Sequence, residues 1–231
     1  MKHNVIDTLI QKLQIETEEL LSRGVMISIG DVRIIPKEIE VYRFQASVFE
    51  DDSVHQNELQ QANPNHFYVH RFGKSAADPY KGRAGVDICL SSTNKLYYTW
   101  LIRAAVIEDL DKVEFITGIS NLRKAILRYT NMTEKQLEDT SLIVSYGYNH
   151  DDVLRASRLR LSKDVSKYWE DAQLRFLVCD DEFKNRKFEG KEKPLVDFIL
   201  REFAAGVKSK EDCQKYCIER LGYTPKDIKN L

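Results

Sequence analysis

Five strand-like runs between residues 25 and 107 constrain the fold of this chain more than any other feature. They cover residues 25–29, 32–44, 67–72, 86–91 and 96–107. All are rich in β-branched and aromatic residues, and turn or loop residues separate them, which is the pattern of antiparallel strands. Gly30-Asp31 predicts a tight turn between the first two runs, and Pro36 predicts an edge or a bulge in the second.

Helical signals flank these runs. Apolar residues recur at spacings of three and four between residues 5 and 21, and Gly24 offers a helix stop. Ser120 is a candidate cap for a helix through residue 129, and Thr133 for another that begins at residue 134. Strand signals return near residues 159–161 and 175–178. The glycine-rich and cationic segment 73–85 predicts a long hairpin loop of the kind that carries function.

The character of the chain changes after residue 180. Residues 183–193 suit a linker, residues 194–205 and 209–221 suit helices, and Thr224-Pro225 opens a short third helix. The sequence therefore predicts an α+β fold in which residues 1–182 form a single domain, a curved and mostly antiparallel sheet flanked by helices. Residues 183–231 are expected to form a linker and helical extension.

Composition narrows the class of protein. No apolar run is long enough for a membrane span, no secretory signal is apparent, and the four cysteines form no disulfide pattern, so we expect a cytoplasmic protein without membrane contact. Cys213 and Cys217 lie one helical turn apart without further ligands, which favours packing over a metal site. The net charge of −1 differs from the basic character usual for duplex binders. Cations nevertheless gather between residues 67 and 83: Arg71, Lys74, Lys81 and Arg83.

Candidate chemistry lies in two of the strand-like runs. Glu40 stands two residues before Tyr42, and Arg103 lies inside the last run. A carboxylate can take a proton from water and offset the positive charge that develops when an N-glycosidic bond breaks, and a guanidinium can orient that water. An aromatic face can receive a base that has left the stack. Direct attack by water is preferred because no lysine is indicated as a nucleophile.

After the triplet Glu40-Val41-Tyr42, six further fragments follow in order: His55, Phe67-Tyr68-Val69-His70, Asp87-Ile88-Cys89-Leu90-Ser91-Ser92, Leu101-Ile102-Arg103-Ala104, Gly118-Ile119-Ser120-Asn121-Leu122 and, with Arg158-Leu159-Arg160-Leu161 before it, Leu174-Arg175-Phe176. This succession resembles the alkyladenine (3-methyladenine) DNA glycosylase family, and the resemblance spans about residues 5 to 180. The resemblance implies Glu40 as the water-activating base and Arg103 as the residue that holds the water. It also implies that Tyr42 stacks on the flipped base and that His55 packs against it.

The chain departs from the family at the base pocket and at the wedge. His70 stands where the family has a second pocket tyrosine, and Asp87 stands where it has an asparagine. A carboxylate that faces the base would favour guanine-type or cationic bases such as 7-methylguanine. Arg71 and Phe72 are the nearest candidates for the wedge, and Lys74, Lys81 and Arg83 for contacts with the DNA backbone. We expect neither a metal nor a cofactor.

The predicted function is hydrolytic removal of a damaged or modified purine from duplex or single-stranded DNA by a monomeric enzyme. Two alternatives remain: a non-catalytic module that holds a nucleobase or nucleic acid, and an N-glycosidase that acts on single strands or free nucleotides. The same residues also permit a structural interpretation, in which Glu40 and Arg103 form a salt bridge without chemistry and Tyr42 is a core aromatic.

Overall fold

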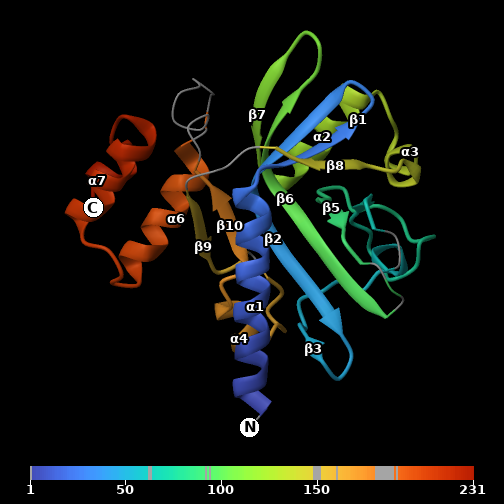
Figure 1. Cartoon of the computed structure of the whole chain (residues 1–231), viewed down its shortest axis with the longest axis horizontal. Helices are drawn as coiled ribbons and strands as arrows, with labels where there is room; N and C mark the ends of the chain where they lie inside the picture. The colour runs from blue at the N-terminus through green and yellow to red at the C-terminus, as the bar shows by residue number, and fades with distance from the viewer. Residues whose placement is uncertain are drawn as a thin grey trace.

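The protein has an α+β fold, in which helices cover a curled antiparallel sheet (Figure 1). The computed structural model describes residues 2–61, 64–91, 93, 95–147, 152–159, 161–179, 190 and 192–231. At this level the predicted fold class is confirmed. Most of the expected linker at 183–193 lies outside the described residues, as does Arg160.

Ten strands and eight helices, one of them a 3-10 helix, make up the described chain. The strands are β1 (Val25–Ile29), β2 (Val32–Gln45), β3 (Phe49–Glu50), β4 (His66–Val69), β5 (Val86–Cys89), β6 (Leu96–Glu108), β7 (Val113–Thr117), β8 (Ile143–Tyr146), β9 (Val153–Ala156) and β10 (Arg175–Val178). The helices are α1 (Lys2–Ser22), the 3-10 helix η1 (Glu58–Gln60), α2 (Ile119–Thr130), α3 (Glu134–Asp139), α4 (Lys167–Asp171), α6 (Glu192–Ala204), α7 (Lys210–Leu221) and α8 (Lys226–Lys229).

The two long strands β2 and β6 form the centre of the sheet. The main strand order is β4-β5-β6-β2-β1-β8, and β10 pairs with both β2 and β9. Every described pairing is antiparallel. The turn at Gly30-Asp31 joins β1 to β2 as predicted, with a positive φ of 56° at Gly30.

Two bulges interrupt the pairing of β2 with β6. The register skips Lys37 on β2 between Pro36 and Glu38, and it skips Arg103 on β6 between Ile102 and Ala104. The bulge predicted at Pro36 is therefore confirmed. A bulge inserts an extra residue into one strand and changes the direction of its side chain, and bulges are common beside functional sites.

One row of paired residues crosses five strands. Arg175 on β10 pairs with Glu40, Glu40 pairs with Leu101, Leu101 with Asp87, and Asp87 with Tyr68. Residues that pair directly project from the same face of a sheet, so these five side chains share one face. The alternate residues Phe67, Ile88 and Ile102 project from the other face and are buried with apolar residues of α2 and α3.

Helices bury both faces of the sheet in different places. Ile10 and Leu13 of α1 pack with Val41 and Trp100 on the face opposite Glu40. Helices α6, α7 and α8 share a core with β10, in which Leu177 meets residues such as Phe198. Figure 1 shows α6 and α7 beyond β9 and β10, at the side of the molecule away from β5. The C-terminal helices thus pack directly on the sheet.

Several local predictions are confirmed and others are wrong. Thr133 and Ser209 cap α3 and α7, and Gly222 ends α7 in the left-handed conformation. The segment between β4 and β5 is a loop, as predicted. Ser120 is not a cap, because α2 begins at Ile119 with Gly118 at the cap position, two residues before the predicted cap. Residues 159–161 hold no described strand, because the strand that pairs with β10 is β9. No sequence pattern predicted the short strands β3, β7 and β8 or helix α4.

Among the described residues, no helix combines the length and the apolar character needed to cross a membrane. All four cysteines are buried, and none of them forms a disulfide.

Candidate functional site

Glu40 is fully buried and receives hydrogen bonds from two directions. The backbone N–H of Leu159 donates to Oε1 at 2.6 Å, and the Tyr42 hydroxyl donates to Oε2 at 2.9 Å. The Arg103 guanidinium lies 3.4 Å from Oε2. Two carboxylate oxygens can accept about four hydrogen bonds, so the two that Glu40 accepts leave room for a further donor such as water.

Tyr42 links Glu40 to a second buried arginine. Residues 40 and 42 share a face because strand side chains alternate, which brings the hydroxyl to the carboxylate. Burial and the Glu40 carboxylate raise the pKa of Tyr42 well above its usual range. The hydroxyl therefore stays protonated and donates a hydrogen bond to Glu40. The Arg158 guanidinium lies 4.8 Å from the centre of the Tyr42 ring. A cation on one face fixes the plane of the ring.

Arg103 uses its bulge position to contact two acidic side chains. Its Nε donates to Glu38 Oε1 at 3.0 Å while its NH1 approaches Glu40. Burial disfavours the charged guanidinium, but the carboxylates of Glu40 and Glu38 outweigh this effect and raise the pKa of Arg103. The Arg103 side chain keeps 16% of its surface exposed, although Glu40 keeps none. Solvent therefore reaches this ion pair from the arginine end.

A series of charges continues from Arg103 to the C-terminal helices. Glu38 Oε1 also accepts a hydrogen bond of 2.8 Å from Nε of Arg175, which is buried. Arg175 in turn pairs with Asp197 on α6, and its guanidinium lies 4.3 Å from the centre of the Phe198 ring. Acidic and basic groups alternate along this series, so each buried charge has a neighbour of opposite sign.

Aromatic and imidazole rings gather at the other end of the row. The rings of His55 and His70 are stacked with centroids 6.1 Å apart, and both lie against Tyr68. The Tyr68 hydroxyl accepts from the backbone N–H of Arg71 and also forms a hydrogen bond of 2.6 Å with Nδ1 of His55. Burial, with the charges of Lys81 and His70, lowers the pKa of His55 to about 4. His55 is therefore neutral at physiological pH.

Asp87 is buried and fully engaged. Its Oδ1 lies 2.7 Å from His70 Nε2, and its Oδ2 accepts from Gln60 at 3.2 Å and from Thr99 at 3.0 Å. The sequence-based expectation placed this carboxylate against a base. The structure instead places His70 against Asp87, and the side chain of His70 is 22% exposed whereas that of Asp87 is 2% exposed. The imidazole is the group that can reach a ligand.

The predicted wedge and backbone residues divide into two groups. The expectation that Arg71 lies on a DNA-facing surface is wrong for this structure, because its buried guanidinium pairs with Glu138 and also bonds to Tyr80. Phe72 is 68% exposed beside it. Lys74 and Arg83 are exposed and Lys81 is partly exposed. Asn57 donates to the carbonyl oxygens of Gly73 and Ser75, which holds the start of this loop against η1.

The structure brings together most, but not all, of the predicted site residues. Glu40, Arg103, Tyr42, His70 and Asp87 occupy one sheet face or its edge, and His55 joins them from the loop before η1. Sequence reasoning missed the supporting groups: Leu159, Glu38, Arg175, Tyr68, Gln60 and Thr99. Glu38 and Thr99 had a detectable signal, because each lies two residues from a residue on the same face.

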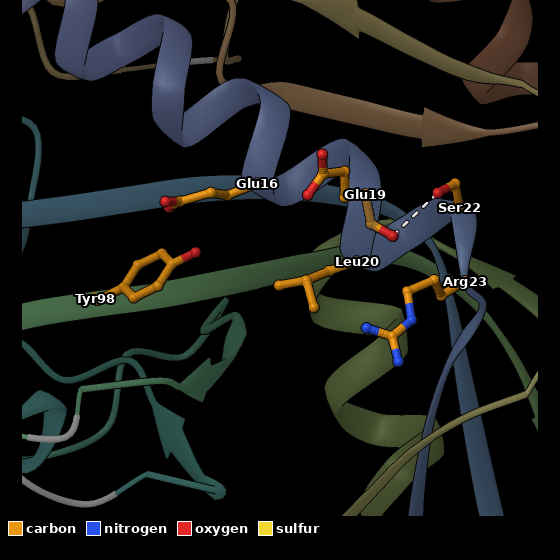
Figure 2. A pocket seen from close by; sticks show the side chains of 6 residues that line it. All are labelled: Glu16, Glu19, Leu20, Ser22, Arg23 and Tyr98. Carbon is orange, nitrogen blue, oxygen red and sulfur yellow. Dashed lines mark hydrogen bonds between the residues drawn. The ribbon is translucent and has the colours of Figure 1, made fainter.

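A surface groove lies elsewhere, at the end of α1 (Figure 2). Its volume is about 520 Å³, and its lining includes Glu16, Arg23 and Tyr98. Tyr98 alternates with Thr99 and Leu101 on β6, so it projects from the opposite face of the sheet. This groove is therefore separate from the Glu40 site. Within the part of the chain that the structure describes, no group of three or more histidine, cysteine or acidic side chains is placed to hold a metal ion.

No protein-family model matches this chain, and no curated protein matches it either.

Proposed function

We propose that this protein hydrolyses the N-glycosidic bond of a modified purine in DNA, on a fold like that of the alkyladenine DNA glycosylases. The observation that carries the proposal is the environment of Glu40. A buried carboxylate receives hydrogen bonds from Leu159 and Tyr42, and an arginine that solvent can reach lies 3.4 Å away.

The proposed reaction uses Glu40 as general base. A water molecule beside Arg103 gives a proton to Glu40 as its oxygen attacks C1′ of the sugar, and the negative charge of Glu40 offsets the oxocarbenium character that develops there. Arg103 orients the water and is itself held by Glu38. The hydrogen bond from Leu159 fixes the Glu40 carboxylate in one rotamer, which keeps this carboxylate directed at the water.

The rings beside this carboxylate are suited to hold a base outside the stack. Tyr42 and the paired rings of His55 and His70 lie on or beside one sheet face, with Leu101 between Glu40 and Asp87 in the paired row. Adjacent strands are about 4.8 Å apart, so the backbones at Glu40 and Asp87 are about 10 Å apart. Leu101, an apolar residue that is 5% exposed, lies between these two carboxylates.

Exposed residues of the loop after β4 favour DNA as the source of that base. Phe72 can enter a duplex at the vacated position, and Lys74 and Arg83 can contact phosphates. Arg71, which Glu138 engages, supports the loop instead. Without activity, the same pocket would act as a nucleobase-binding module. If duplex and single-stranded DNA were cut equally, the single-strand alternative would be favoured.

The test is the substitution Glu40→Gln. It keeps the shape of the side chain and removes the general base. We therefore expect excision from duplexes that contain hypoxanthine or 7-methylguanine to fall by about 10²-fold or more, while the variant still binds these duplexes. Glu108→Gln is the control, because Glu108 on β6 pairs at the surface with Arg33 on β2, the strand that carries Glu40. Equal excision by Glu40→Gln and the parent would refute the assignment. Binding without excision by the parent would favour the binding module.

A further inference from the structure

Arg43 on β2 is a partly buried arginine without a counter-ion. Among the described residues, it is the one arginine that is not exposed and yet forms neither a hydrogen bond nor an ion pair. Its Nε is buried and has no partner. Nε of the buried Arg158 also lacks a partner, but its terminal nitrogens donate to Asp51. A guanidinium carries five N–H donors and stays charged in proteins, so the missing acceptor at Arg43 requires an explanation.

Two aromatic rings hold the guanidinium of Arg43. Strand alternation puts Arg43 on the sheet face opposite Glu40 and Tyr42, where it pairs directly with Tyr98 of β6. Its guanidinium carbon lies 5.6 Å from the centre of the Tyr98 ring and 5.8 Å from the centre of the Phe49 ring. The faces of these rings attract a cation, but they leave its N–H groups without an oxygen acceptor. Burial raises the pKa of Tyr98, so its hydroxyl stays neutral and supplies no negative charge.

Arg43 also lines a cavity of about 190 Å³ between α1 and β3. Four of the other lining residues are apolar: Leu9 and Leu13 of α1, with Val48 and Phe49. Lys12 and Glu16 line it as well, but their side chains are 72% and 47% exposed and lie 3.8 Å apart as an ion pair. Glu16 is thus paired at the surface, and it also lines the groove of Figure 2, which adjoins this cavity. The cavity therefore has apolar walls and one cation without a partner.

We propose that this cavity binds a small aliphatic monocarboxylate, whose carboxylate pairs with Arg43 and whose tail packs against Leu9 and Leu13. A guanidinium and a carboxylate match in geometry, because two parallel N–H groups can donate to the two oxygens. A cavity of about 150 Å³ is large enough for benzene. A cavity of about 190 Å³ therefore has room for an acid of similar size, such as butyrate with its four carbon and two oxygen atoms.

The lining favours an aliphatic acid over inorganic phosphate. Both ligands are oxyanions that a guanidinium can bind. Phosphate has oxygens on every side, and the apolar walls at Leu9, Leu13 and Phe49 offer their side chains no donor for them. The carboxylate of Glu16 at the rim also repels the higher charge of phosphate more strongly. A monocarboxylate places one charge at Arg43 and removes apolar surface from water along the rest of its length.

The experiment is calorimetric titration of the full chain with acetate, propionate, butyrate, butanol and phosphate at fixed ionic strength. For the parent we expect the affinity to rise about fourfold for each CH₂ from acetate to butyrate, the usual effect of burying this group. Arg43→Gln should bind butyrate at least about 10-fold more weakly, because a charge-assisted contact is lost. Arg33→Gln is the matched control and should bind as the parent does, because Arg33 lies on the same strand but pairs at the surface with Glu108.

Glu16→Gln keeps the proposal testable if Arg43→Gln folds poorly. It removes a negative charge from the exposed rim, so butyrate should bind a few times more tightly than to the parent. Equal affinity of the parent and Arg43→Gln for butyrate would overturn the proposal, as would a parent that binds butanol or phosphate as tightly as butyrate, or that binds none of the acids. None of these outcomes depends on release of a base, so they leave the proposed role of Glu40 untouched.

Discussion

Two buried pairs of a carboxylate and an arginine lie close together in this protein, and they differ in how completely they are closed. Asp51 and Arg158 have no exposed side-chain surface, and the guanidinium also donates to the carbonyl oxygens of Val41 and Trp169. Glu40 is equally buried, but its partner Arg103 is partly exposed and lies 3.4 Å away. The first pair is closed to solvent, and its guanidinium bonds through both terminal nitrogens although Nε of Arg158 is left without a partner, whereas the second pair keeps a side open to solvent.

The contrast distinguishes an ion pair that supports the structure from an ion pair that is proposed to take part in the reaction. A closed pair holds its neighbours in place, and Arg158 does so for the Tyr42 ring. An open pair keeps hydrogen-bonding capacity for something that is not part of the chain. The same distinction applies in the loop after β4, where Glu138 engages Arg71 but Lys74 and Arg83 are exposed. Burial of a charge is therefore less informative about function than the number of partners it already has.

The largest effect is expected when the closed pair is broken. Asp51→Asn leaves the Arg158 charge buried without a counter-charge, which should lower the free energy of unfolding by about 3–5 kcal/mol. Denaturant unfolding measures this loss. Glu108→Gln, which removes an exposed pair, should cost no more than about 1 kcal/mol. If the two substitutions proved equally mild, Asp51 and Arg158 would not have the supporting role assigned to them.

Tyr42 contacts both pairs, so its substitutions divide the two roles. Tyr42→Ala removes the ring and should weaken binding to lesion-containing DNA by about 1–3 kcal/mol, the usual value of stacking on a base. Tyr42→Phe should keep that affinity but excise more slowly, because Glu40 loses a hydrogen bond. Equilibrium binding and single-turnover rates distinguish the cases. Loss of thermal stability in Tyr42→Ala without any change in affinity would identify a core aromatic instead.

The smallest expected effect tests the open cations of the loop. Lys74→Ala and Arg83→Ala should each reduce the salt dependence of DNA binding by about 0.9 in the slope of log K against log salt, the value for one phosphate contact. Lys135→Ala is the matched control, because Lys135 is an exposed lysine on α3 that pairs with Asp139. Identical slopes for all of these proteins would remove the loop from the DNA interface.

The sequence was sufficient for the local part of the site and insufficient for the rest. Alternation along β2 places Glu40 and Tyr42 on one face, and this followed from their spacing alone. The bulge that directs Arg103 at Glu40 depends on the register of two strands distant in sequence. The Leu-Arg-Leu pattern at 159–161 indicated a strand, but the N–H of Leu159 bonds to Glu40. Arg71 and Lys74 look alike in sequence, because only tertiary packing decides which one meets Glu138.

A series of alternating charges, Arg103, Glu38, Arg175 and Asp197, connects the proposed catalytic pair to the C-terminal helices. A chain shortened before α6 would leave Arg175 without Asp197 and would uncover Leu177 and its apolar neighbours. Arg175 would then bond differently to Glu38, and the orientation of the Arg103 side chain, which bonds to the same carboxylate, would change. If Glu40 and Arg103 have the proposed catalytic role, proteolytic loss of this end should therefore slow the reaction, even though both residues would remain in the protein.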